Sequence, residues 1–202
     1  MQIPLEATQL SECHNFGKAV YRSTLDSDEV IIKQRSIAWE ALLFSTQSPL
    51  VKILDKEGPP LFSHLAQTQT LERGEHYGVV RALKPLPSST KIEEMLQQFS
   101  SLGAYGAALG ITDLNCQNLL VTEQGITVVD AEVVLEMSLG MGGTGLFPGF
   151  FSGPLLTSGM IVIGTFFLQG ERFLEVSLER YFQALERIIS CREALVYEMR
   201  QA

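Results

Sequence analysis

Two oxygen-rich motifs separated by a β-prone stretch constrain this chain more than any other feature of its sequence. Residues 113–118 read DLNCQN, and residues 130–132 read DAE. Between them, residues 119–129 form two β-prone runs around a polar turn that contains glycine, a pattern typical of a β-hairpin. A hairpin there would carry Asp130 back beside Asn118. The fold would then place side-chain oxygens from both motifs at one edge.

The residue types in these motifs match what phosphoryl transfer from a magnesium nucleotide requires. Such a site needs a carboxylate that receives or orients the attacking hydroxyl, an oxygen ligand for the metal, and a second carboxylate that bridges metal and phosphates. Asp113, Asn118 and Asp130 offer that set. The alternative is an ordinary surface loop in which Asp and Asn form turns, followed by an amphipathic hairpin.

The N-terminal part of the chain predicts a second hairpin followed by a helix. Residues 16–23 and 29–35 have the composition of strands and are joined through the polar residues 26–28. Residues 36–44 then have helical character, and we expect Ser36 to be the N-cap of that helix.

Lys33 lies at the end of the second predicted strand, and Glu40 lies on the predicted helix. In a kinase-like cleft, a strand lysine contacts the α- and β-phosphates of ATP and is held by a helix glutamate. We therefore expect Lys33 and Glu40 to face one another or to serve the nucleotide. A lysine in this position is otherwise usually solvated. Gly17 would let backbone amides approach a phosphate, although one glycine does not make a glycine-rich loop.

The middle of the chain predicts a hinge between two lobes. Residues 77–83 read as a strand, and residues 84–89, with two prolines, read as a linker. A capping box that begins at Thr90 then starts an amphipathic helix leading to Asp113. We expect an α+β, two-lobe, protein-kinase-like fold. Its small β-rich N-lobe would span residues 1–86, and its mainly helical C-lobe, with the catalytic loop and metal motif, would span residues 87–202.

The C-terminal residues predict an amphipathic packing helix or a pair of helices. Apolar side chains recur there at helical spacing with charges between them: Leu174, Leu178, Tyr181, Leu185, Ile188, Leu195 and Met199. A partner-binding helix would show the same pattern.

Charge and cysteine content argue against some classes of function. The formal net charge is -8, and the chain lacks the clustered Lys and Arg stripe that nucleic-acid binding requires, so we expect no nucleic-acid partner. Cys13, Cys116 and Cys191 have no CxxC spacing and indicate neither a disulfide framework nor a zinc site. The three histidines form no ligand pattern, and we expect them at the surface or at caps.

Residues 137–169 contain no charged side chain. Glycine and proline interrupt this stretch repeatedly, its uniformly apolar part is shorter than a spanning helix, and no basic cluster flanks it. We therefore expect a buried loop with a short core helix or strand rather than membrane insertion. The N-terminus has no signal-peptide pattern, so we expect a cytoplasmic protein, or one delivered to a host cell as an effector.

A series of short motifs, taken in order, resembles the kinase-like dehydratase domain of class II lanthipeptide synthetases. The motifs lie at residues 30–36, 77–78, 102–104, 110–118, 130–132 and 144–148. Their order and the distances within the region 113–132 carry the resemblance, which extends from about residue 15 to about residue 150.

The resemblance implies a fold, a reaction and residue roles. Such synthetases are similar to lipid and protein kinases in fold, and they phosphorylate Ser or Thr of a peptide with magnesium and ATP before eliminating the phosphate. Carried over, Lys33 would hold phosphate and Asp113 would serve the attacking hydroxyl. Asn118 and Asp130 would bind magnesium, with Glu132 supporting the metal site.

Departures from the family pattern narrow the expected chemistry. The family's histidine in the catalytic loop is Asn115 here, which keeps a polar side chain but loses a titratable group near the phosphates. Lys33 is followed by glutamine rather than by the family's proline. The chain has no zinc cyclase segment, so ring closure is not expected, and the elimination step stays open.

We therefore expect a minimal bacterial kinase-like transferase that uses ATP and Mg²⁺ to phosphorylate Ser or Thr of a peptide or protein partner. One alternative is a pseudokinase that acts as a binding or scaffold module. Another is a kinase-fold enzyme that transfers a different group, such as AMP. A third places residues 137–169 on or in a membrane.

Overall fold

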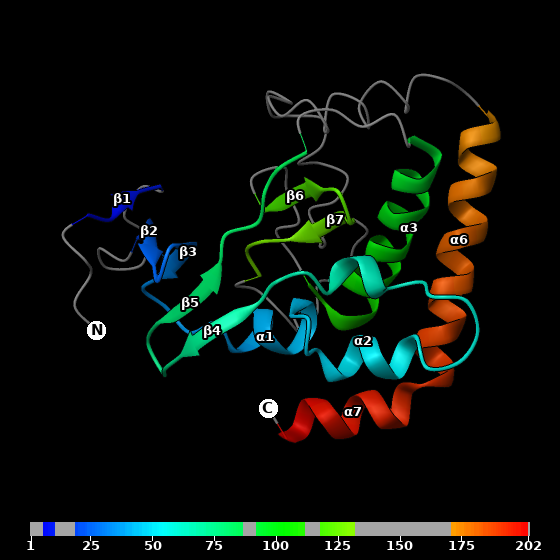
Figure 1. Ribbon diagram of the computed structural model, residues 1–202. Helices are drawn as coiled ribbons and strands as arrows, with labels where there is room; N and C mark the ends of the chain where they lie inside the picture. The colour runs from blue at the N-terminus through cyan, green and yellow to red at the C-terminus, as the bar shows by residue number, and fades with distance from the viewer. Residues whose placement is uncertain (1–5, 11–18, 87–91, 112–117, 132–170, 202) are drawn as a thin grey trace.

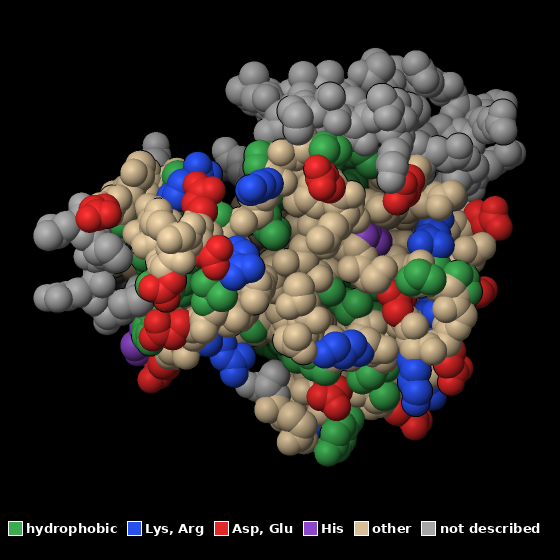
Figure 2. Space-filling view, viewed as in Figure 1, with side chains coloured by type: hydrophobic (Ala, Val, Ile, Leu, Met, Phe, Trp, Pro, Cys, Tyr) green, Lys and Arg blue, Asp and Glu red, His purple; other side chains and the backbone are tan. Residues whose placement is uncertain are grey.

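The structure is an α+β fold in which a sheet and a group of helices lie side by side (Figure 1). The computed structural model describes residues 6–10, 19–86, 92–111, 118–131 and 171–201. Within these residues the predicted α+β class is confirmed. On the face seen in Figure 2, acidic and basic side chains are interspersed.

The sheet has five antiparallel strands in the order β1-β2-β3-β5-β4. Their bounds are β1 Thr8–Gln9, β2 Val20–Leu25, β3 Asp28–Lys33, β4 Thr70–Arg73 and β5 Gly78–Arg81. The predicted hairpin of β2 and β3 is confirmed, because Leu25 pairs with Asp28 across a two-residue turn. Both turn residues have positive φ, 49° at Asp26 and 75° at Ser27, as a type I′ turn requires.

Helix α1 spans Ala38–Phe44 and follows β3 directly. The prediction that Ser36 caps this helix is wrong, since the cap position is Ile37, whose side chain makes no capping bond. The Ser36 hydroxyl instead accepts a hydrogen bond from the Ala38 N–H at 3.3 Å, so the serine lies one residue too early. Ile37 is fully buried and contributes packing in place of a cap.

The second predicted hairpin is also confirmed. It consists of β6 (Leu119–Thr122) and β7 (Gly125–Val128), with Leu119 opposite Val128. The hairpin forms a sheet of its own and lies between the five-stranded sheet and helix α3 (Figure 1). Nearly all of its residues are buried, unlike those of β2.

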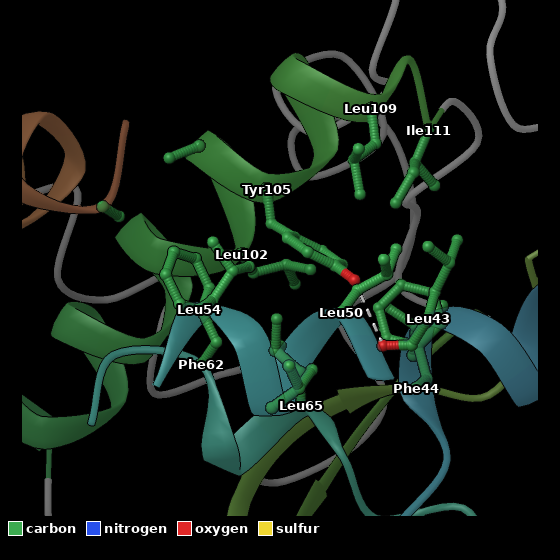
Figure 3. Close-up of a cluster of buried hydrophobic side chains, with 14 of the residues drawn as sticks. Leu43, Phe44, Leu50, Leu54, Phe62, Leu65, Leu102, Tyr105, Leu109 and Ile111 are labelled. Carbon is green, nitrogen blue, oxygen red and sulfur yellow. Dashed lines mark hydrogen bonds between the residues drawn. The ribbon is translucent and has the colours of Figure 1, made fainter. Parts of the chain in front are cut away.

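The larger hydrophobic cluster packs the helices around this second hairpin. It draws on α1, on α2 (Pro49–Leu54), on the 3-10 turn η1 (Ser63–Leu65) and on α3 (Ile92–Leu109). Tyr105 of α3 is fully buried at its centre and donates its hydroxyl to the Leu43 carbonyl at 3.3 Å (Figure 3). Burial raises the pKa of Tyr105.

The buried apolar residues of the described ranges form two clusters of unequal size. The smaller one lies on the five-stranded sheet and consists of Val30, Ile32 and Val79 with two flanking tyrosines. The larger one draws on residues from both sides of position 86. The predicted boundary between lobes at residues 86 and 87 stays a prediction.

The C-terminal residues form two helices, α6 (Glu171–Ser190) and α7 (Arg192–Gln201), which is one of the two arrangements that the sequence predicts. Helix α6 runs along α3, and α7 contacts α2 (Figure 1). Arg187 donates to the Leu54 carbonyl at the end of α2, at 2.9 Å, which ties α6 to that helix. Leu178 of the predicted packing stripe is 45% exposed and does not belong to the core.

No helix within the described ranges is long and apolar enough to cross a membrane. The uncharged stretch at residues 137–169 lies outside those ranges, as do Cys13, Cys116 and the predicted capping box at Thr90. Cys191, at the junction of α6 and α7, is a half-buried free thiol.

Candidate functional site

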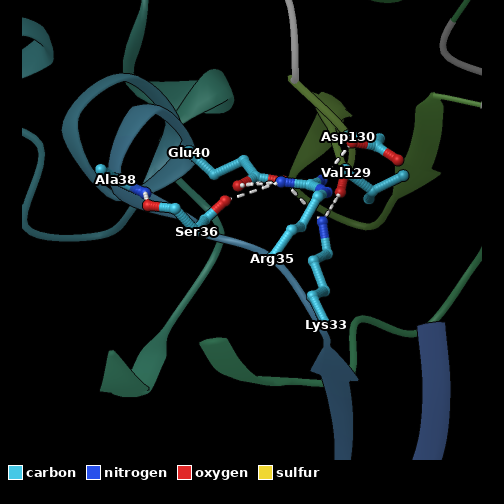
Figure 4. Close-up of polar contacts among 7 residues, drawn as sticks. All are labelled: Lys33, Arg35, Ser36, Ala38, Glu40, Val129 and Asp130. Carbon is cyan, nitrogen blue, oxygen red and sulfur yellow. Dashed lines mark hydrogen bonds and ion pairs between the residues drawn. The ribbon is translucent and has the colours of Figure 1, made fainter. Parts of the chain in front are cut away.

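Lys33 is buried at the end of β3, where the sheet meets α1 and the second hairpin. Its side chain is only 7% exposed, and Nζ donates to Glu40 Oε1 at 2.6 Å and also to the Val129 carbonyl (Figure 4). The predicted pairing of Lys33 with Glu40 is therefore confirmed. A buried ammonium is costly unless it is paired and hydrogen-bonded, and both conditions hold here.

The carboxylate of Glu40 on α1 pairs with two basic side chains. Besides Lys33, it accepts from both terminal nitrogens of Arg35, at 2.6 Å to Oε1 and 3.1 Å to Oε2, with its own side chain 3% exposed. Burial would raise the pKa of Glu40, but the Lys33 ammonium and the Arg35 guanidinium outweigh it and hold that pKa below its usual value. Glu40 is thus a buried carboxylate that stays charged.

A glycine on β5 lets α1 approach Lys33 closely. Gly78 pairs with Lys33 in the sheet, and a Cβ added there would lie within 2.3 Å of Ile37 Cγ1. The missing side chain makes room for Ile37, which immediately precedes α1. This close approach helps to place Glu40 within reach of Lys33.

Asp130 reaches the same place from the other hairpin. It follows β7 and is 29% exposed, and its carboxylate accepts a hydrogen bond from Arg35 Nη2 (Figure 4). The Val129 N–H donates to the Asn118 carbonyl at 2.8 Å, so the open end of the hairpin holds Asn118 and Asp130 close in space. This arrangement is the one that the hairpin pattern predicts.

Buried amide side chains hold the second hairpin in position. Gln98 of α3 accepts from the Ile126 N–H at 3.0 Å, and Gln67 donates to the Gly125 carbonyl at 3.2 Å. Thr127 donates to the Leu65 carbonyl at 2.8 Å. These bonds tie β6 and β7 to α3 and η1, so they fix where Asp130 lies.

His64 belongs to the same buried network, which contradicts its expected place at the surface or at a cap. Its exposure is 9%, and Nε2 donates to the Gln98 carbonyl at 3.1 Å. Burial lowers the pKa of His64 to about 4, opposed by the hydrogen bond to Gln98. His64 is therefore neutral at pH 7.

The structure brings together half of the predicted site residues. Lys33, Glu40 and Asp130 form one contact group with Asn118 adjacent. The other predicted residues lie outside the described ranges: Gly17, Asp113, Asn115 and Glu132.

Arg35 is the site residue that sequence reasoning missed. It bonds to both Glu40 and Asp130 and so links the sheet side of the site to the hairpin side. A signal was available, because the predicted strand runs to residue 35 and strand residues two apart point to one side, although β3 itself ends at Lys33. The contact with Asp130 could not be inferred that way, since it depends on where the second hairpin packs.

The residue types at the open end of the second hairpin include two that magnesium takes as ligands at nucleotide sites. Magnesium at nucleotide sites takes one or two carboxylates and completes its shell with phosphates and water. Asp130 has a carboxylate and Asn118 a side-chain amide, and the backbone bond from the Val129 N–H to the Asn118 carbonyl brings the two residues near each other. Within the described part of the chain, no three His, Cys, Asp or Glu side chains gather into a metal-binding group.

A separate pocket of about 390 Å³ lies between α1, β4 and α7. Residues that line it include Ala41, Ser45, Thr70, Arg73 and Glu198, and none of the predicted site residues lines it. The pocket shares α1 with Glu40 but is not part of the cluster around Lys33.

Comparison with protein families places the chain in one family. It belongs to the family described as a domain of unknown function (DUF4135), whose model matches residues 5–147. The matched span contains Lys33, Arg35, Glu40, Asn118 and Asp130. No curated protein matches the chain.

Proposed function

We propose that this protein is a magnesium-dependent phosphotransferase that moves the γ-phosphoryl group of ATP to a Ser or Thr hydroxyl of a peptide or protein. We further propose a two-lobe, kinase-like arrangement related to the dehydratase domain of class II lanthipeptide synthetases. The observation that carries the proposal is the buried Lys33–Glu40 ion pair, which lies beside Asp130. The strand β3, the helix α1 and the second hairpin each bring one of these three residues to the site.

A buried ion pair contributes little to stability compared with apolar residues of the same volume. Lys33 is 5% exposed and Glu40 2% exposed, at the junction of a sheet, a helix and a hairpin. Because burying these charges costs desolvation energy, their presence there favours a functional role. The rival explanation is a structural ion pair that only joins the elements.

Each described side chain has a distinct task in the proposed reaction. Lys33 would hold the phosphates while Glu40 keeps the ammonium in place, and Asp130 with Asn118 would hold Mg²⁺. Mg²⁺ held by these two residues would supply positive charge against the negative charge that develops on the transferred phosphoryl group. Asp113 would orient the attacking hydroxyl. Rate enhancement would come from positioning and from preorganised charge.

The test uses ATP labelled separately at the γ- and α-phosphates, with a degenerate peptide library that contains Ser or Thr. We expect magnesium-dependent transfer of the γ-label by the wild type, and loss of that transfer in Lys33→Met, Asp113→Ala and Asp130→Ala. Asp28→Ala is the matched control, because Asp28 is an exposed carboxylate on the same sheet, paired to Arg81. It should transfer label as the wild type does.

Calorimetric titration with magnesium and a non-hydrolysable ATP analogue separates the alternatives. Binding without transfer would favour the scaffold function, and transfer of the α-label would favour a nucleotidyl transferase. If the wild type binds no magnesium nucleotide, the proposed function is wrong.

A further inference from the structure

Arg35 is the one described side chain that bonds to the carboxylates on both sides of the site. Its guanidinium pairs with both oxygens of Glu40 and reaches the Asp130 carboxylate through Nη2 (Figure 4). Its side chain is 15% exposed, so water and salt screen its contacts less than those of a surface arginine. The guanidinium already lies on the carboxylate that the proposed function assigns to magnesium.

Arg35 and a divalent cation would compete for Asp130. Two cations on one half-buried carboxylate repel each other strongly, because water screens them little there. The four described charges balance, with Lys33 and Arg35 positive and Glu40 and Asp130 negative. A metal ion added to these four charges alone would leave a net positive charge, whereas one that enters with phosphates would not.

Arg35 can leave Asp130 without leaving the buried Glu40 carboxylate unpaired. Glu40 keeps its bond from Lys33 at 2.6 Å, which does not involve Arg35. The planar guanidinium pairs with phosphate oxygens as readily as with a carboxylate, through two parallel N–H bonds. Arg35 lies two residues beyond Lys33, the residue proposed to hold the phosphates, so a phosphate bound by Lys33 would be near Arg35.

We propose that Arg35 holds the metal position at Asp130 in the nucleotide-free protein and transfers its guanidinium to the nucleotide phosphates when metal and nucleotide bind together. Arg35 thereby makes metal binding conditional on nucleotide. This inference rests on the proposed function, since it takes Asp130 as the metal ligand and a nucleoside triphosphate as the anion.

Two affinities test the inference, and neither requires turnover. The first is for Mn²⁺ alone, followed by the electron paramagnetic resonance of the free ion. The second is for magnesium with a non-hydrolysable ATP analogue, followed by calorimetry. In Arg35→Gln we expect Mn²⁺ alone to bind about tenfold more tightly and the nucleotide about tenfold more weakly, which is the factor that one charge-assisted hydrogen bond carries.

Arg35→Lys separates charge from shape. The lysine keeps the positive charge but cannot form the two-pronged contact, so Mn²⁺ affinity should stay near the wild-type value while nucleotide affinity falls. The control is Arg81→Gln, because Arg81 is a half-exposed arginine of β5 that pairs with Asp28 away from the site. It should change neither affinity.

The outcomes distinguish this inference from the proposed function. If the wild type binds the magnesium nucleotide but both affinities in Arg35→Gln equal those of the wild type, the inference is wrong and the proposed function stands. If the wild type binds no magnesium nucleotide, both are wrong. Should Arg35→Gln fail to fold by circular dichroism, Arg35→Lys decides, and unchanged nucleotide affinity there overturns the inference.

Discussion

The two β-hairpins of this protein both bring residues to the site, but they are held in place by different forces. The hairpin of β2 and β3 ends at Lys33, which is fixed by buried charges on Glu40 and Arg35. The hairpin of β6 and β7 ends near Asp130 and is fixed by neutral hydrogen bonds from Gln98, among others. The first depends on charge, and the second depends on amide and hydroxyl partners.

The hairpins also differ in their turns. The turn of β2 and β3 is exposed and contains no glycine, although both of its residues have positive φ. In the second hairpin, Gly125 has a φ of +119° and lies against the Gln98 amide. The turn of the first hairpin can therefore be improved by substitution. In the second hairpin the turn residues Glu123 and Gln124 are exposed too, but the buried Gly125 that follows them cannot tolerate a side chain. In each hairpin, the turn end and the open end that leads to the site can therefore be perturbed separately.

Removing the central anion of the charged hairpin should have the largest effect. In Glu40→Ala, Lys33 loses its 2.6 Å partner while remaining buried, so we expect the free energy of unfolding to fall by about 3–5 kcal/mol. Urea denaturation measures this change. Glu29→Ala is the matched control, since Glu29 is a half-exposed glutamate of β3 paired to Arg22, and it should change stability by less than about 1 kcal/mol. Equal effects in the two variants would show that the buried charges do not hold the first hairpin.

A side chain at the buried Gly125, the first residue of β7, should disrupt the neutral network. In Gly125→Ala, the new Cβ would lie 2.1 Å from Gln98 Oε1 on a backbone with a φ of +119°. Displacing Gln98 removes the partner of the Ile126 N–H, so we expect a loss of about 3 kcal/mol from strain and the lost bond together. Denaturation gives the stability, and hydrogen exchange at the Ile126 amide reports the bond.

Gly58→Ala separates backbone strain from displacement of Gln98. Gly58 also has positive φ, at +77°, but its added Cβ would meet only the end of the flexible Arg187 side chain, at 2.9 Å. We expect a smaller loss of about 1–2 kcal/mol there. A larger loss in Gly58→Ala than in Gly125→Ala would contradict the assigned role of Gln98.

Acid should weaken the neutral network through His64 before it weakens the charged one. The folded state lowers the pKa of His64 to about 4, whereas an unfolded histidine titrates near 6.5. The unfolded state therefore binds more protons between these values, and stability that is present above pH 6.5 is lost as the pH falls towards 4. We expect a loss of about 2 kcal/mol between pH 7 and pH 5.

His64→Gln tests this dependence because glutamine retains an N–H donor for the Gln98 carbonyl without titrating. Urea denaturation at pH 7, 6 and 5 should show a much smaller pH dependence in this variant. His76→Gln is the control, since His76 has a side chain that is 78% exposed, and it should retain the wild-type dependence. An unchanged dependence in His64→Gln would assign the acid effect to other groups.

The parts of the fold and site that could be predicted are those with local causes. Both hairpins follow from alternating β-prone runs around polar turns, and the Lys33–Glu40 pair follows from a strand end and the helix after it. The contact of Arg35 with Asp130 spans 95 residues and depends on how the second hairpin packs, which no local pattern encodes. His64 and Gln98 are polar residues whose burial depends on partners supplied by distant elements. Ser36 shows the opposite error, in which a good capping residue lies one position too early.

The smallest expected effect comes from the exposed turn of the charged hairpin. Ser27 has a φ of 75°, a left-handed conformation that costs a residue with a Cβ about 1–2 kcal/mol. Glycine removes that cost but loses more freedom on folding, which offsets about 0.5–1 kcal/mol of the gain. Ser27→Gly creates an Asp-Gly turn, the favoured type I′ sequence, so we expect a net gain of about 0.5 kcal/mol in the free energy of unfolding.

The measurement for Ser27→Gly is the urea midpoint, with magnesium-nucleotide affinity recorded in parallel. The turn lies at the end of β3 where Leu25 pairs with Asp28, whereas Lys33 lies at the opposite end, where it pairs with Val20. Stability should therefore rise without a change in affinity. Ser23→Gly on β2 is the control, since it removes a buried side chain from a regular strand and should be destabilising. If Ser27→Gly altered nucleotide affinity, the turn and the site of the first hairpin would be coupled, and the separation between the two ends of each hairpin would not hold.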